Sequence, residues 1–164
     1  MTLEEFNSAA PGPLTTALRA CCDVPAWADK VRAGRPYANA GALVAVADQA
    51  ARELTAAEVD RALAAHPRIG ERAQGKDVES AWSRQEQSAV GGDPGTAAAL
   101  IEGNRAYEAK FGRVFLICAT GLSGEQILAN LRERLGHTPE EEAPVVAGEL
   151  RKIAVLRVRK LVDG

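Results

Sequence analysis

The chain has 164 residues, a length that suits one domain with a substantial hydrophobic core. With 46% hydrophobic and 26% charged residues it has the composition of an ordinary soluble globular protein, and a net charge of -2 without a basic block argues against nucleic-acid binding. No segment approaches the ~18 consecutive apolar residues of a membrane span. An acidic N-terminus and the lack of a peroxisomal C-terminal signal predict a cytoplasmic protein.

Helix-start and helix-stop signals recur along the chain, and abundant alanine favours helices over sheet. Capping boxes at Thr2, Thr55 and Ser123 mark three helix starts. Pro25 and Pro139 suit the first turn of two others. In chain order, the predicted helices cover residues 2–9, 14–21, 25–34, 39–52, 55–66, 78–90, 94–111, 123–136 and the region from 138 onward.

One apolar run stands apart from these helices. Residues 114–119, between Gly112 and Gly121, suit either a lone buried extended segment or a short core helix, and periodicity does not separate the two. Because no second strand candidate exists to pair with this run, we expect no sheet. The predicted fold is therefore all-α: one domain over residues 1–164, a helical bundle of roughly eight helices without linkers or internal repeats.

His66 is one of only two histidines, and it precedes Pro67, which disfavours the α conformation in the residue before it. The preceding helix must therefore end near His66, where the helix dipole favours a charged imidazole. Such a histidine is suited to donate a proton near neutral pH. The alternative is a structural histidine whose ring caps the helix through a backbone carbonyl.

A second polar group follows at helical spacing. Ser83, Glu86 and Gln87 stand at i, i+3 and i+4, so a helix places them on one face. A carboxylate beside an amide and a hydroxyl suits a small ligand rich in hydrogen-bonding groups, whereas the alternative is a solvated helix face. Arg84 and Gln85, which lie between them, complete the candidate binding residues of this helix.

The apolar run and the last helix add further candidates. An unpaired segment leaves backbone N–H and C=O groups that can bind an amide-like ligand, although we expect its side chains to be plain core. An arginine that binds a carboxylate would come from the basic group of the last helix, most of which we expect to be solvated. That group is Arg151, Lys152, Arg157, Arg159 and Lys160.

We expect neither a metal site nor a cofactor. His66 and His137 lie far apart, no His-x-x-x-His or Cys-x-x-Cys spacing occurs, and no glycine-rich phosphate loop is present. Cys21 and Cys22 are adjacent, which argues against a disulfide framework. Cys118 lies among apolar residues that would raise the pKa of its thiol, which argues against a cysteine nucleophile.

Six groups of residues, weak singly but specific in their order and spacing, cover nearly the whole chain. They are Cys21-Cys22 with Trp27, His66-Pro67 with Ile69-Gly70, Ser83-x-x-Glu86-Gln87, Asn104-x-x-Tyr107-x-x-Lys110-Phe111-Gly112, Phe115-Leu116-Ile117-Cys118, and Lys152-Ile153 with Leu156-Arg157. Together they resemble the 2-oxo-4-hydroxy-4-carboxy-5-ureidoimidazoline (OHCU) decarboxylases of urate degradation.

The resemblance implies an all-helical lyase without a cofactor, usually a homodimer, that converts OHCU into (S)-allantoin and carbon dioxide. It implies His66 as the catalytic acid/base and Glu86 as its carboxylate partner. The residues implied to line the substrate are Pro67, Ser83, Gln87, the backbone of Phe115, Leu116, Ile117, Cys118 and Ala119, and the side chain of Arg157. The chain departs from the eukaryotic pattern in the loop 68–71, and its lack of a peroxisomal tail points to a bacterial cytoplasmic member.

Two other functions compete with this one. A small helical ureide-binding regulatory module would bind without turnover, and a hydrolase would act on the preceding 5-hydroxyisourate. The presence of both His66 and Glu86 favours the decarboxylase over a sensor, since a sensor needs no proton shuttle. The lack of a clear nucleophile or metal site disfavours the hydrolase.

Overall fold

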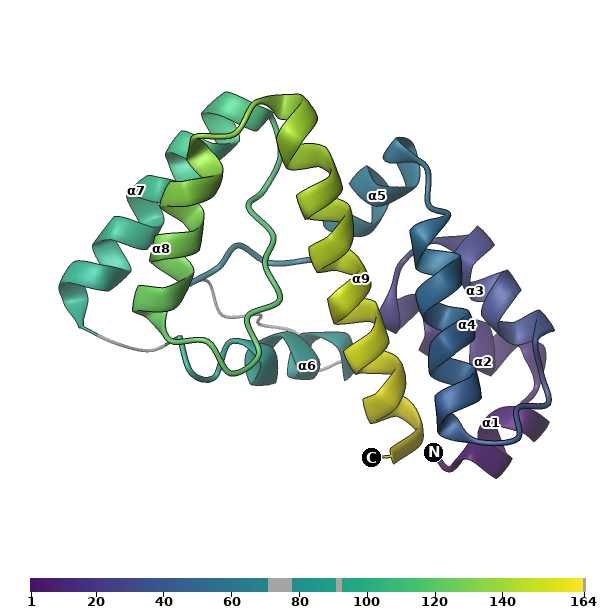
Figure 1. Cartoon of the computed structure of the whole chain (residues 1–164). Coiled ribbons are helices and arrows are strands. Elements are labelled where there is room, and N and C mark those ends of the chain that lie inside the picture. The colour runs from purple at the N-terminus through teal and green to yellow at the C-terminus, as the bar shows by residue number, and fades with distance from the viewer. Residues whose placement is uncertain (71–77, 91–92, 164) are drawn as a thin grey trace. The chain divides into compact units, whose positions relative to one another are not determined.

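The computed structural model describes residues 1–70, 78–90 and 93–163 (Figure 1), and every regular element in these ranges is a helix. The nine helices described are α1 (Leu3–Ser8), α2 (Pro11–Cys21), α3 (Pro25–Ala33), α4 (Ala40–Arg52), α5 (Ala56–Leu63), α6 (Val78–Glu86), α7 (Pro94–Phe111), α8 (Gly124–Leu135) and α9 (Pro139–Asp163). The predicted all-α class is confirmed, with nine helices in these ranges where roughly eight were expected. Glu71, in the loop after His66, lies outside the described residues.

The chain divides into two compact units. The first comprises residues 1–65 and 150–164, and the second comprises residues 66–149. Helix α9 contributes its first part to the second unit and its remainder to the first. The expectation of a single domain stays a prediction.

In the first unit, two buried aromatic side chains join neighbouring elements. Trp27 Nε1 donates a hydrogen bond of 3.0 Å to the carbonyl of Ala47, which links α3 to α4. The hydroxyl of Tyr37 donates to the carbonyl of Val31 at 2.6 Å. Helix α2 begins at Pro11, three residues earlier than predicted, because proline is tolerated in a first turn where its missing N–H has no intrahelical acceptor.

In the second unit, α7 and α8 lie side by side (Figure 1). A Cβ at Gly103 would lie 2.4 Å from a methyl group of Leu131, so glycine lets the two helices approach closely without displacing this buried leucine. The buried core of this unit comprises Ile69, Val90, Leu100, Tyr107, Phe115, Ile117, Ala119, Ile127, Leu128 and Leu131.

The apolar run 114–119 is a lone non-helical segment of this core. Helix α7 ends at Phe111, and Gly112 follows with a left-handed φ of 69°, which stops the helix. Four of the six residues in the run are buried, and the described residues contain no strand to pair with it. The short core helix considered from the sequence is therefore wrong.

Candidate functional site

His66 lies in the second unit, at the start of the loop 66–70. Helix α5 ends at Leu63, three residues before the predicted end, because the N–H of Ala65 turns back to the carbonyl of Ala62 at 3.2 Å and tightens the chain. The half-buried His66 follows this turn. His66 therefore lies three residues beyond the end of α5 and not in its last turn, where the sequence predicted it. Any influence of the helix dipole on His66 is weaker at this distance.

The predicted polar face of α6 is confirmed for two of its three members. Ser83 and Glu86 are only 4% and 8% exposed, so this face is not the solvated surface that the alternative interpretation required. The helix ends at Glu86 and not at residue 90, which leaves Gln87 just beyond it. Of the intervening residues, Arg84 is half-buried and Gln85 is exposed.

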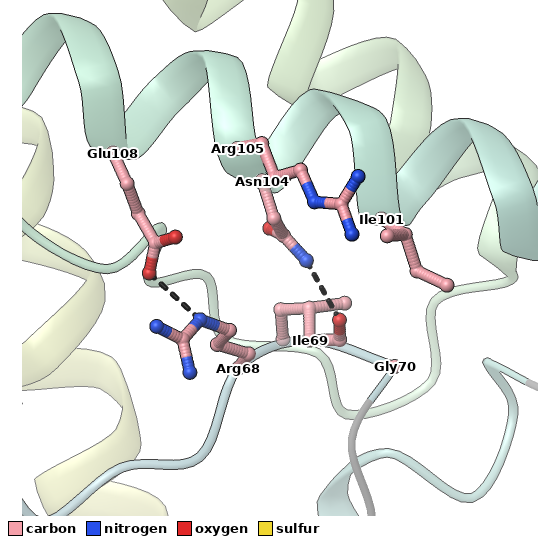
Figure 2. A pocket seen from close by; sticks show the side chains of 7 residues that line it. All are labelled: Arg68, Ile69, Gly70, Ile101, Asn104, Arg105 and Glu108. Atoms are coloured by element: carbon pink, nitrogen blue, oxygen red, sulfur yellow. Dashed lines mark hydrogen bonds and ion pairs between the residues drawn. The ribbon is translucent and has the colours of Figure 1, made fainter.

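Three consecutive residues of the loop 66–70 are tied to the end of α6 and to α7. Arg68 Nε lies 2.8 Å from Glu108 Oε1, Asn104 Nδ2 donates to the carbonyl of Ile69 at 2.9 Å, and the N–H of Gly70 donates to Gln87 Oε1 at 3.0 Å. Figure 2 shows the first two of these contacts reaching from α7 to the loop. A cavity of about 370 Å³ borders them, lined by Arg68, Ile69, Gly70, Ile101, Asn104, Arg105 and Glu108.

The contact from Gly70 bears on the expected role of Gln87. Its side-chain oxygen is occupied by the backbone of the loop, so the amide nitrogen is the part of this side chain that remains to donate to a substrate. Gln87 therefore has a structural task that the sequence did not reveal, beside the binding role that stays a prediction.

The backbone of the segment 114–119 is less open than predicted. The carbonyl of Leu116 accepts a 2.6 Å hydrogen bond from Arg134 Nη1, and the N–H of Cys118 donates to Glu149 Oε1 at 3.2 Å. The carbonyl of Ala119 accepts from the N–H of Leu122 at 2.9 Å. The premise of unpaired backbone groups is wrong for these three, whereas the binding role of Phe115 to Ala119 stays a prediction.

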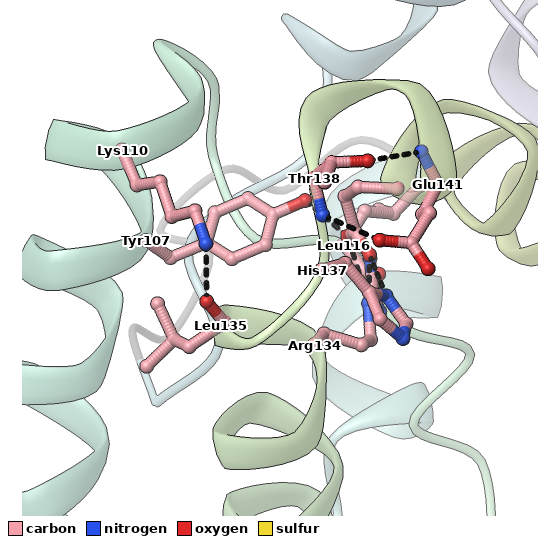
Figure 3. A network of polar contacts seen from close by, with 9 residues as sticks. Tyr107, Lys110, Leu116, Arg134, Leu135, His137, Thr138 and Glu141 are labelled. Carbon is pink, nitrogen blue, oxygen red and sulfur yellow. Dashed lines mark hydrogen bonds and ion pairs between the residues drawn. The ribbon is translucent and has the colours of Figure 1, made fainter.

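Sequence reasoning missed a buried ionic network beside this segment. Arg134, 4% exposed, holds Glu142, 2% exposed, through contacts of 2.6 Å and 2.9 Å from two of its nitrogens. The hydroxyl of Tyr107 donates to the same carboxylate at 2.5 Å, and His137 Nδ1 lies 3.1 Å from its other oxygen. Figure 3 shows Tyr107, Arg134 and His137 converging at the end of α8. Arg134 also stacks 4.5 Å from the ring centre of Phe115.

The network changes the acidity of two of its members. Burial acts to raise the pKa of Glu142, but hydrogen bonds from Arg134, Tyr107 and His137 outweigh it and lower the pKa below its ordinary value. Burial, and then donation to Glu142, raises the pKa of the Tyr107 hydroxyl, so that group remains a donor. The carboxylate is thus kept ionised, as its contact with a buried guanidinium requires.

Arg157 lies in the first unit, on α9. Its side chain is 1% exposed, and Nη1 donates to the carbonyl of Ala20 at 3.0 Å. Its basic neighbours Lys152 and Arg159 are exposed, and Arg151 forms an ion pair of 2.7 Å with Asp48. Burial therefore distinguishes Arg157 within the basic group from which the sequence drew its carboxylate-binding candidate.

The described part of the chain contains no group of three or more His, Cys, Asp or Glu side chains that could hold a metal ion. Cys21 and Cys22 are buried and Cys118 is half-buried, and no disulfide joins any two of the three. None of the described helices has the length and apolar character needed to cross a membrane.

Comparison with known proteins identifies the family. Residues 7–159 match the family of OHCU decarboxylases. The chain is 34% identical to a 2-oxo-4-hydroxy-4-carboxy-5-ureidoimidazoline decarboxylase of Amia calva, over 85% of this chain and 81% of that protein. It is 30% identical to the uric acid degradation bifunctional protein TTL of Arabidopsis thaliana, over 87% of this chain and 45% of that protein.

A solved structure agrees with these relatives. A crystal structure of an OHCU decarboxylase in the presence of (S)-allantoin superposes with a TM-score of 0.75 at 26% identity, over 89% of this chain and 96% of that one. The order of motifs, the all-helical fold and these relatives lead to one assignment, and the chain belongs to the OHCU decarboxylase family.

Proposed function

We propose that His66 and Glu86 perform the acid–base chemistry by which this chain decarboxylates OHCU to (S)-allantoin and carbon dioxide in urate degradation. The family and its relatives support the decarboxylase activity, and the solved relative crystallised with (S)-allantoin supports the product. The observation that carries the residue assignment is the burial of Ser83 and Glu86 on one face of α6, in the same unit as the loop that begins at His66.

The reaction can proceed without a cofactor because the substrate carries its own electron sink. The bond between C4 and the carboxylate breaks, its electron pair forms a double bond to the ring carbon that bears the ureido group, and the electron pair of the former C=N moves onto the ring nitrogen, which takes up a proton. The enol so formed then gains a proton at the carbon that bears the ureido group, while the C4 hydroxyl loses its proton and becomes a carbonyl. The protein must orient the carboxylate perpendicular to the ring, stabilise the developing charge and protonate one face.

The acid–base task suits His66 and Glu86. A buried carboxylate is costly unless it is paired, so Glu86 is poised to hold and charge a cationic partner, and the half-buried His66 is the candidate for it. Protonation from a fixed histidine would reach one face of the intermediate and set the S configuration. Near neutral pH an imidazole can both give and accept the proton.

The binding task is distributed over neutral donors and one cation. The hydroxyl of Ser83 and the amide nitrogen of Gln87 would bind the ureido or ring amides, together with backbone groups of the segment 115–119. Pro67, Arg84 and Gln85 complete the predicted lining. The buried guanidinium of Arg157 is suited to a carboxylate.

We expect the enzyme to work without metal or other cofactor, as a homodimer, in the cytoplasm. A regulatory ureide-binding module would bind OHCU without releasing carbon dioxide. A hydrolase would instead consume 5-hydroxyisourate.

The proposal is tested with freshly generated OHCU, by following the circular dichroism of the allantoin formed. Wild-type protein should yield (S)-allantoin, and His66→Ala should lose at least ~10²-fold in turnover, the scale of a lost general acid. Glu86→Gln should mainly lower kcat, because a neutral amide cannot stabilise imidazolium, whereas the exposed Glu102→Gln on α7 serves as the matched control. Near-wild-type turnover by a folded His66→Ala variant would contradict the assignment.

A further inference from the structure

One hydrogen bond connects α7 directly to the backbone of the loop 66–70. The carbonyl of Ile69, three residues after His66, accepts a 2.9 Å hydrogen bond from Asn104 Nδ2 (Figure 2). Arg68 and Gly70, on either side of Ile69, line the cavity of about 370 Å³ between the loop and α7. The side chain of Ile69 packs in the buried core of this unit, and the hydrogen bond from Asn104 adds a directional constraint on the loop backbone beside the cavity.

Asn104 is an unfavourable choice for the core of α7 if stability alone mattered. Its side chain is only 4% exposed, and Oδ1 is buried without a hydrogen-bond partner among the residues that the structure describes. A buried acceptor without a partner costs free energy, which a leucine at this position would avoid. Local departures from good packing chemistry of this kind are typical of functional positions. The amide of Asn104 compensates for this cost with its hydrogen bond to the carbonyl of Ile69.

We propose that Asn104 is a positioning residue, whose hydrogen bond to Ile69 fixes the loop so that His66 can reach the substrate. The inference rests on the proposed catalytic role of His66. Because Pro67 has a fixed φ, few rotatable bonds separate Ile69 from His66, and a shift of one moves the other. Proton transfer needs the two heavy atoms within hydrogen-bond reach, and a displacement of about 1 Å can cost on the order of 10²-fold in rate.

The first test separates positioning from stability. Asn104→Leu removes the buried Oδ1, for which the described residues offer no partner, but it also leaves the carbonyl of Ile69 without its donor. Because these two effects oppose each other, the unfolding transition should stay close to that of wild type. We expect kcat to fall by roughly tenfold or more with a smaller change in KM. Asn130→Leu is the matched control, because Asn130 Nδ2 also donates at 2.9 Å to a carbonyl, that of Gln126 in its own helix α8. The control should keep the wild-type kcat.

The second test restores the hydrogen bond without restoring the amide. Asn104→Asp places a carboxylate near the carbonyl of Ile69, and only its protonated form can donate to that carbonyl. The rate of this variant relative to wild type should therefore rise as the pH falls through the pKa of the new carboxyl. The charged side chains that line the same cavity, Arg68, Arg105 and Glu108, are present in both proteins, so the ratio isolates the substituted group.

These outcomes distinguish the inference from the function on which it rests. Lack of turnover by wild type, or full turnover by His66→Ala, would overturn the proposed function before any Asn104 variant is made. With both of those results as expected, a folded Asn104→Leu variant with wild-type kcat would overturn the positioning role. So would an Asn104→Asp rate that keeps a constant ratio to wild type across the pH range.

Discussion

Two non-helical stretches of the second unit, the loop 66–70 and the segment 114–119, are held by opposite means. The loop is tied by two neutral hydrogen bonds, of which the one from Asn104 is buried, and by an ion pair whose Arg68 side chain is 47% exposed. The segment is largely buried, and its carbonyl at Leu116 is held by Arg134, whose charge is balanced by the buried Glu142.

This difference predicts which contacts matter for stability and which for catalysis. A buried charge left without its partner is strongly destabilising, whereas the loss of one neutral hydrogen bond costs less. Mutations in the ionic network should therefore lower the free energy of unfolding. Mutations in the loop ties should leave the protein folded and change its kinetics.

The largest effect is expected from Arg134→Met, which leaves the carboxylate of Glu142 buried without its cation. The free energy of unfolding should fall by about 3–5 kcal/mol in urea denaturation. Arg19→Met removes a half-exposed i,i+4 ion pair with Asp23 on the surface, and it should cost at most about 0.5 kcal/mol. Equal losses for the two variants would contradict the assigned role of the network.

A second change sharpens the same test. In Arg134→Met with Glu142→Leu both buried charges are gone, so the double variant should be more stable than Arg134→Met alone. A double variant less stable than the single one would show that the contacts of Glu142 with Tyr107 and His137 outweigh the cost of its unpaired charge.

The network also predicts how stability depends on pH. The pKa of Glu142 in the folded protein lies below its ordinary value of 4.5, so the unfolded chain takes up this proton first as the pH falls. Stability from this group is fully present above pH 4.5 and is lost as the pH drops through the lowered pKa. Glu142→Gln should be less stable than wild type at pH 7, and the gap should narrow on acidification. A gap that stays constant down to pH 3 would exclude this linkage.

Local chemistry made most helices predictable from the sequence. The capping boxes at Thr2, Thr55 and Ser123 are all present, because a cap needs only residues three positions apart. The shared face of Ser83 and Glu86 followed from helical periodicity for the same reason. The motifs and their order then sufficed to identify the family.

Long-range contacts explain what the sequence could not show. Nothing in the spacing of Arg134 and Glu142 reveals that they meet across the break between α8 and α9, beside a tyrosine from α7. The tie between Gly70 and Gln87 was equally hidden, because it joins a loop to a residue just past a helix end. The position of Arg134, two residues before Gly136 at the end of α8, is a weak sequence signal of the network.

A kinetic effect of intermediate size is expected at Gln87, where the loop tie and the binding role can be separated. Gln87→Ala removes both and should lower kcat and raise KM by several-fold each, as one hydrogen bond is worth ~1 kcal/mol. Gln87→Glu keeps an oxygen acceptor for the N–H of Gly70 but loses the amide donor, so it should raise KM and largely preserve kcat. A Gln87→Glu variant that loses kcat as severely as Gln87→Ala would refute the tie.

Ser83→Ala provides the companion measurement on α6. We expect a milder rise in KM than for Gln87→Ala, because a single neutral hydroxyl contact is lost from the binding face. The exposed Ser88→Ala, just beyond the helix, is the matched control and should behave like wild type. A Ser83→Ala variant with unchanged KM would remove this residue from the predicted substrate lining.

The smallest effect is expected for the ion pair between Arg68 and Glu108. This pair tests whether charge contributes to holding the loop 66–70, as it does for the segment 114–119. The contact is short, 2.8 Å, but the arginine side chain is 47% exposed, so solvent and salt screen the charges. A double-mutant cycle with Arg68→Gln and Glu108→Gln should give a coupling below about 1 kcal/mol, which shrinks further as salt is added. Exposed ion pairs do not reach the free-energy loss expected for Arg134→Met. A coupling of that size would therefore mean that the loop, like the segment 114–119, is held mainly by charge.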